Sequence, residues 1–179
     1  DDGRLNFKQL NDYLKAQGYD ETIERKTNAR PLYVYTKTIT LANGKEVDVE
    51  IRHLLVETAI ESRSTTFAKF FKEAVENADV IIYGGHSGLG GNLDIPSLES
   101  KAGAFKFNPK KRQIFYFDSC ASYAYYLGQF KAEKTKSKID ILTNGLSSYF
   151  ETSEAVLEGL LENVLSETEN DVSWSDIMK

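Results

Sequence analysis

Two stretches of the sequence decide its fold: VIIYGGHSG at residues 80–88 and QIFYFDSC at residues 113–120. Each contains a short run of apolar and aromatic residues, at positions 80–83 and 114–117, which is typical of a strand buried on both faces of a parallel sheet. A third run, IDIL at residues 139–142, has the same character. These runs predict three neighbouring parallel strands.

Between and around these strands, apolar residues recur with the spacing of one face of a helix. The segments with this spacing are residues 64–77 and 152–165. We expect a further helix at residues 121–130, and residues 97–105 can hold a short crossover helix. Strands that alternate with helices predict an α/β protein, a three-layer αβα sandwich with a mainly parallel central sheet.

The first sixty residues have a different pattern. Residues 6–17 predict a surface helix, and residues 32–40 and 47–51 predict a hairpin that turns at Asn43-Gly44. We expect one domain over residues 1–179, with this helix and hairpin in residues 1–60, a core in residues 64–165 and a tail in residues 167–179.

Composition excludes several classes of protein. The chain has 179 residues, of which 41% are hydrophobic and 27% charged, with a net charge of -5. This is globular composition. The mild acidity predicts no binding to nucleic acid or to an anionic membrane, and the apolar runs are too short to span a bilayer. With neither an initiator Met nor a signal peptide at Asp1, we expect a trimmed or processed chain.

The single cysteine and one of the two histidines follow neighbouring predicted strands. His86 lies in the glycine-rich loop after residues 80–83, and Cys120 directly follows the strand at residues 113–117. Ligands of α/β sheets bind beyond the carboxyl ends of such strands. A Cys/His pair suffices for nucleophilic acyl transfer, because the thiolate attacks a carbonyl and the imidazolium protonates the leaving amine.

The predicted position of Cys120 suits this chemistry. It would open the helix at Ala121, whose free N–H groups and dipole would favour the thiolate. The N–H of Cys120 itself can then donate to the oxyanion of a tetrahedral intermediate. Each of the two side chains also has a plain interpretation as a packing residue, since free cysteines are often buried.

Other sites fit the sequence less well. The stretch Gly85-His86-Ser87 is similar to a nucleophile elbow, but its fifth position is Leu89 and no histidine follows His86. The glycine-rich loop lacks the lysine and spacing of a phosphate-binding loop, and no zinc-ligand spacing is present. His53 continues the covered face of the second hairpin strand, so we interpret it as a packed, hydrogen-bonded residue.

The two strand-and-loop stretches resemble those of the caspase-like (clan CD) cysteine peptidases, especially the metacaspase, clostripain and gingipain types. In that family an apolar strand leads into Gly-His and the next strand leads into a catalytic Cys. The resemblance covers about residues 64–165. It implies His86 as general acid, Cys120 as nucleophile, and the backbone N–H groups of Ser87 and Cys120 as the oxyanion hole. Family members usually have Gly where this chain has Ser87.

The resemblance also implies a substrate-binding role for Asp118, two residues before Cys120. In the Asp-x-Cys form of the family this carboxylate selects Arg or Lys beside the cleaved bond, and a carboxylate can bind a guanidinium by bidentate, charge-assisted hydrogen bonds. Asp118 could equally be a turn or cap residue. Lysines in the segment 131–138 suggest self-cleavage, although such a charge run is commonly a solvated loop.

We therefore predict a cysteine endopeptidase that cleaves after Arg or Lys, needs no metal or cofactor, and acts on a peptide or protein substrate. Two alternatives remain: a catalytically inactive caspase-like module that binds peptides or protein partners, which the serine at position 87 motivates, and a plain α/β domain. Bacterial relatives of the family imply a secreted or periplasmic location. The sequence does not predict the oligomeric state.

Overall fold

The computed structural model describes residues 2–25, 31–56, 65–169 and 173–177. Its contacts divide the chain into two compact units, Asp1–Leu55 with Phe150–Lys179, and Val56–Tyr149. We call them the antiparallel unit and the parallel unit after their sheets. The prediction of one peptidase domain over residues 1–179 stays a prediction. Ser64, where the helical pattern starts, and Met178 in the tail lie outside the described residues.

The antiparallel unit contains the predicted hairpin and a strand that the sequence did not predict. Strands β2 (Leu32–Thr40) and β3 (Glu46–Leu54) pair antiparallel, and β1 (Asp20–Arg25) pairs with the other side of β2. Helices α1 (Asp2–Ala16) and α6 (Phe150–Val164) belong to this unit, as does the short α7 (Trp174–Ile177). The core joins these elements through apolar side chains: Leu10, Leu14 and Tyr35, with Leu157 and Leu161 packed against them.

The parallel unit contains the three predicted parallel strands. They are β4 (Val80–Gly84), β5 (Gln113–Asp118) and β6 (Ile139–Thr143), in the spatial order β4-β5-β6. The helices are α3 (Thr65–Asn77), α4 (Ile95–Ala102) and α5 (Ser122–Ala132), and two 3₁₀ turns occupy Gly88–Leu93 (η1) and Lys136–Lys138 (η2). The mixed α/β class and the parallel strands are thus confirmed, whereas the hairpin strands form a separate antiparallel sheet.

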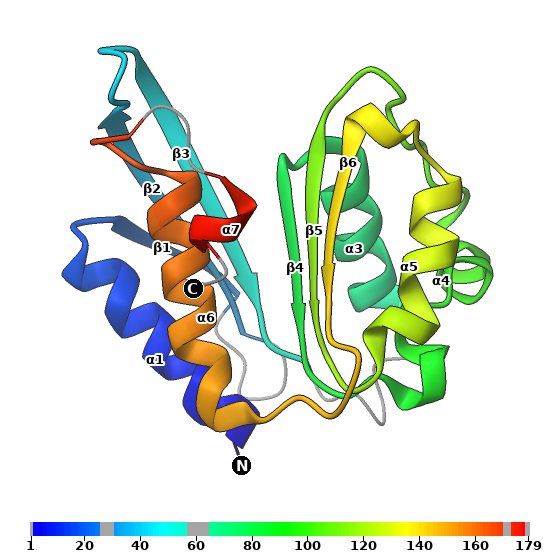
Figure 1. Cartoon of the computed structure of the whole chain (residues 1–179). Coiled ribbons are helices and arrows are strands. Elements are labelled where there is room, and N and C mark those ends of the chain that lie inside the picture. The colour runs from blue at the N-terminus through cyan, green and yellow to red at the C-terminus, as the bar shows by residue number, and fades with distance from the viewer. Residues whose placement is uncertain (1, 26–30, 57–64, 170–172, 178–179) are drawn as a thin grey trace. The chain divides into compact units, whose positions relative to one another are not determined.

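Strand order explains where the helices of the parallel unit lie. Each step from β4 to β5 to β6 moves in the same direction across the sheet, so right-handed crossovers place α4 and α5 on the same face. Figure 1 shows α3, α4 and α5 together on that face. Alternate strand residues, including Ile81, Phe115 and Phe117, point into the core beneath these helices.

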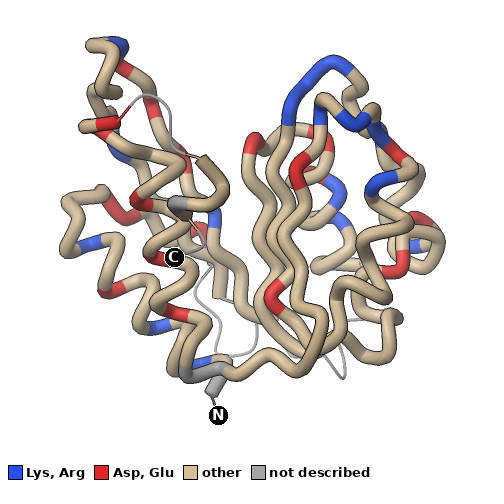
Figure 2. The backbone as a smooth tube through the Cα atoms, in the orientation of Figure 1, with Lys and Arg blue, Asp and Glu red and all other residues tan. Residues whose placement is uncertain are grey.

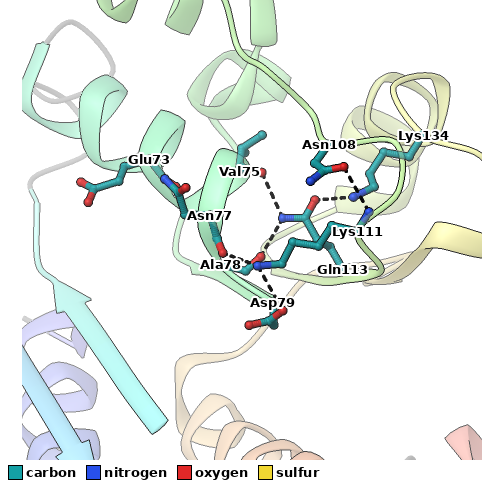
Figure 3. A network of polar contacts seen from close by, with 9 residues as sticks. All are labelled: Glu73, Val75, Asn77, Ala78, Asp79, Asn108, Lys111, Gln113 and Lys134. Atoms are coloured by element: carbon teal, nitrogen blue, oxygen red, sulfur yellow. Dashed lines mark hydrogen bonds and ion pairs between the residues drawn. The ribbon is translucent and has the colours of Figure 1, made fainter. Parts of the chain in front are cut away.

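A polar network closes the amino end of the parallel sheet, where β4, β5 and β6 begin (Figure 3). The buried amide of Gln113 donates to the carbonyls of Val75 at 3.0 Å and Ala78 at 2.7 Å, and its oxygen accepts from the buried ammonium of Lys134. Nearby, Lys111 pairs with Asp79 at 3.1 Å. The Gln113 side chain thus provides hydrogen-bond partners both for backbone carbonyls at the end of α3 and for the buried ammonium of Lys134.

Candidate active site at the carboxyl end of the parallel sheet

The pairing of β4 with β5 brings the His86 and Cys120 loops together. Gly84 is the register partner of Asp118, and the N–H of Gly85 continues the ladder by donating to the Asp118 carbonyl at 3.0 Å. His86 and Cys120 each lie two residues beyond this last register pair. His86 is exposed and Cys120 partly buried. The two loops therefore meet at one edge of the sheet, and contact between thiol and imidazole stays a prediction.

The peptide that follows His86 is held by buried side chains. Its carbonyl accepts from the Tyr83 hydroxyl at 2.6 Å and from Nδ2 of Asn92 at 2.6 Å. The next carbonyl, of Ser87, accepts from the Tyr126 hydroxyl at 2.7 Å. Burial raises the pKa of Tyr83 to about 12, so its hydroxyl keeps the proton that it donates. Both carbonyls are thus fixed toward the interior.

This anchoring fixes the direction of the Ser87 N–H. In a planar trans peptide the N–H points opposite to the preceding carbonyl. Because the His86 carbonyl points toward Tyr83 and Asn92, the Ser87 N–H points away from them. Ser87 has φ -74° and ψ -24°, an ordinary conformation for any residue, and the left-handed turn falls on Gly88 with φ 58°. The serine at this position therefore adds no backbone strain to the predicted oxyanion hole.

Two non-glycine residues with positive φ lie beside the candidate residues. Leu89 has φ 53° in the loop after His86, and Ala121, directly after Cys120, has φ 51°. They are the two such residues in the part of the chain that the structure describes. A left-handed backbone costs an L-residue about 1 to 2 kcal/mol, and such conformations cluster at functional sites.

The start of α5 differs from the sequence prediction. The helix begins at Ser122, and Ala121 is its N-cap, so Cys120 lies two residues before the helix. The expectation of free N–H groups there is wrong for its first turn: Ser122 N donates to the Ser119 carbonyl at 3.3 Å, and Tyr123 N donates to the Asn144 carbonyl at 3.1 Å. The Asn144 carbonyl, in a neighbouring loop, thus accepts from an N–H group of α5 that was expected to be free.

That neighbouring loop, residues 144–149 after β6, is the part of the site that the sequence analysis missed. The Leu146 carbonyl accepts from Ala121 N at 2.8 Å, and the Ser148 carbonyl lies 4.0 Å from Sγ of Cys120. The signal was available, because polar residues follow a predicted parallel strand at the same edge of the sheet. The loop thus supports the backbone around Cys120.

Asp118 fastens this loop to β5. The residue is buried, and its Oδ1 accepts from Nδ2 of Asn144 at 2.9 Å and from the hydroxyl of Ser148. These bonds give Asp118 a structural role at the site. Its role in binding a basic substrate side chain stays a prediction.

The other residues singled out in the sequence lie elsewhere. His53 is in the antiparallel unit, where its Nδ1 is 2.9 Å from Oδ1 of Asn11 and its ring centroid is 4.1 Å from that of Phe7. The residue as a whole is partly exposed, but desolvation of its covered ring lowers the pKa to about 3. The interpretation as a packed, hydrogen-bonded residue is confirmed.

The lysine segment is not a solvated loop throughout. Lys131 belongs to α5 and Lys136 to η2, while the ammonium of Lys134 is buried against Gln113. A protease would need to unfold this part of the chain to cleave after Lys134. Self-cleavage stays a prediction for the exposed lysines.

Among the residues that the structure describes, no group of three or more His, Cys, Asp or Glu side chains could hold a metal ion. No described helix is long and apolar enough to cross a membrane.

Comparison of the chain with models of protein families, with curated proteins and with solved structures found no match.

Proposed function

We propose that this protein is a cysteine endopeptidase of caspase-like type, in which Cys120 is the nucleophile and His86 the general acid. The observation that carries the proposal is the register of β4 against β5. It brings the loops of the single cysteine and of an exposed histidine to the carboxyl end of one parallel sheet.

In the proposed reaction, the Cys120 thiolate attacks the carbonyl carbon of the scissile peptide bond, and the carbonyl oxygen takes the negative charge. The N–H groups of Ser87 and Cys120 stabilise this oxyanion. His86 then gives a proton to the leaving amine, and the C–N bond breaks. Water hydrolyses the resulting thioester, which releases the acid product and regenerates the thiol.

The anchored peptide after His86 supports this mechanism. The bonds from Tyr83 and Asn92 hold the His86 carbonyl, and with it the direction of the Ser87 N–H, before any substrate binds. A donor held in advance needs no reorganisation during the reaction. The left-handed residues Leu89 and Ala121 are further support, since strain of this kind is typical of active sites.

The finer parts of the proposal are the three-layer caspase-like fold and cleavage after Arg or Lys. Asp118 supplies the carboxylate for a basic side chain, with Oδ1 bonded to Asn144 and Ser148. A fluorogenic panel tests the preference: peptides ending in Arg or Lys should be cleaved faster than the same peptides ending in Asp. Faster cleavage after Asp would contradict it.

A thiol-reactive peptidyl probe tests the nucleophile directly. We expect it to label Cys120, with the modified site identified by mass spectrometry, and we expect His86→Gln to slow labelling strongly. The matched control is His53→Gln, because the chain has two histidines and this one lies in the antiparallel unit. Absence of labelling at every pH would favour an inactive module that binds peptides.

A further inference from the structure

Exposed apolar side chains gather around the candidate nucleophile. Within the described residues 65–149, every large hydrophobic side chain that is exposed comes from the loops at the carboxyl end of the parallel sheet or from the first turn of α5: Leu89, Tyr123, Tyr125, Leu146 and Tyr149. Leu89 and Leu146 are the most exposed, at 85% and 83%. Exposed hydrophobic residues are normally scattered singly over the surface of a folded protein, so their concentration at one edge of the sheet indicates a function.

The same edge has no charge in its loops. Residues 84–93, 119–130 and 144–149 contain no Lys, Arg, Asp or Glu, although 27% of the chain is charged. Figure 2 shows these segments in tan, while lysine and arginine residues gather at the opposite end of the parallel unit. Apart from the carboxylate of Asp118 at the end of β5, a partner that lies against these loops would therefore meet uncharged groups.

Leu89, the most exposed of these side chains, is on a residue with a strained backbone conformation. Leu89 adopts φ 53° and ψ 35° within η1, a conformation that glycine would adopt without strain. Neighbouring Gly88 and Gly90 also have positive φ, so the turn is tight and its apex presents the leucine to solvent. Strain combined with exposure indicates a binding role.

We infer that these five side chains form a binding surface for the apolar side chains of a peptide substrate, on either side of the residue after which it is cleaved. The inference rests on the proposed function and sharpens it: the substrate is an extended, uncharged, apolar segment around a single cleaved residue. The occupant is a peptide because the surface borders Cys120 and His86, whose proposed chemistry requires a peptide bond there.

The first test compares two peptides on the full chain. Both have the same Arg before the scissile bond, flanked by Leu and Phe in one and by Ser and Gly in the other. We expect kcat/KM to be at least about tenfold higher for the apolar peptide, mainly through KM, because partial burial of each apolar side chain stabilises binding. Equal cleavage of both peptides would overturn the inference and leave the peptidase intact.

Variants locate the surface. Leu89→Ser and Leu146→Ser should each lower kcat/KM for the apolar peptide about fivefold to tenfold more than they lower it for the Ser/Gly peptide. The matched controls are Leu5→Ser and Ile23→Ser, which are exposed at 56% and 40% in the antiparallel unit and should change neither rate. Equal losses on both peptides, or losses in the controls, would contradict the inference.

A binding measurement separates this inference from the proposed function. In the Cys120→Ala protein, fluorescence anisotropy should show that the labelled apolar peptide binds more tightly than the labelled Ser/Gly peptide. Adding Leu146→Ser should weaken the binding of the apolar peptide. If the apolar peptide binds but the native chain does not cleave it, the proposed peptidase activity is refuted and the peptide-binding surface is retained. Absence of peptide binding would overturn the inference. A second result would also overturn it: light scattering that shows a dimer broken by Leu146→Ser, together with equal binding of the two peptides, since a second copy of the chain would then cover this surface.

Discussion

The two ends of the parallel sheet are built from different residues. At the amino end, the buried Gln113 and Lys134 satisfy each other and two backbone carbonyls, and surface ion pairs surround them. At the carboxyl end, the loops carry no charge, two non-glycine residues have left-handed backbone, and leucines are exposed. The polar groups of the amino end stabilise the fold, whereas the carboxyl end has strained backbone and exposed apolar side chains. This contrast is expected where one edge of a fold binds a ligand.

The largest effect we expect is from Cys120→Ala. Loss of the nucleophile should lower peptide cleavage by at least about 10³-fold. Because the thiol is only partly buried and its hydrogen bond to the Ser148 carbonyl is long, at 4.0 Å, thermal unfolding should change little. Fluorogenic assay and calorimetry on the same preparation check both points. A variant that retained its activity would refute the proposed role of the carboxyl end.

At the amino end, Gln113→Leu should have the opposite signature. It removes the partner of Lys134 and the donor to the Val75 and Ala78 carbonyls, so we expect the free energy of unfolding to fall by about 3 kcal/mol. Urea unfolding measures this, and cleavage by the folded fraction should be unchanged.

The control for that variant is Arg112→Gln, which removes an exposed ion pair with Asp140 and should cost less than about 1 kcal/mol. Adding Lys134→Met to Gln113→Leu should restore part of the loss, because no buried charge is then left without a partner. A Gln113→Leu protein as stable as the parent would show that the network contributes nothing.

A smaller effect should follow from Gly88→Ala in the His86 loop. Gly88 has φ 58°, and a Cβ there would lie 2.5 Å from Oδ1 of Asn92, the side chain that holds the His86 carbonyl. We expect about 2 kcal/mol of destabilisation and a drop in kcat. Gly91→Ala is the control, since a Cβ there meets nothing within 4 Å. Equal behaviour of the two variants would argue against the anchoring.

The smallest effect concerns pH. Burial lowers the pKa of Lys134, and the charges of Lys111 and Lys138 lower it further. A lysine whose pKa is lower in the folded state binds fewer protons there, so stability should rise as pH increases toward about 10.5, the pKa of an unfolded lysine. Lys134→Met should remove this part of the rise, measured by urea unfolding at several pH values. An identical pH dependence in both proteins would contradict the assignment.

Much of the fold follows from the sequence because apolar periodicity is strong. Strands β4, β5 and β6 and helix α3 lie within a few residues of their predicted bounds. The strand β1 was missed because its sequence, DETIER, has a single apolar residue, and what makes it a strand is its pairing with β2. Local propensity does not report such pairing.

The candidate site was predictable only in part. The positions of His86 and Cys120 follow from strand order, but the roles of Asn144 and Ser148 depend on tertiary hydrogen bonds to Asp118. Likewise, no sequence rule predicts a left-handed backbone at Leu89 or Ala121, because these residue types disfavour it. The strain becomes visible only once the surrounding structure imposes it.

The anchored peptide after His86 has one more consequence. The side chains that hold the His86 and Ser87 carbonyls are an amide and two phenols, and burial keeps the phenols of Tyr83 and Tyr126 uncharged well beyond neutrality. Acid or mild alkali therefore leaves this turn in one shape. A change of cleavage rate over this pH range would consequently not come from a loosening of this turn.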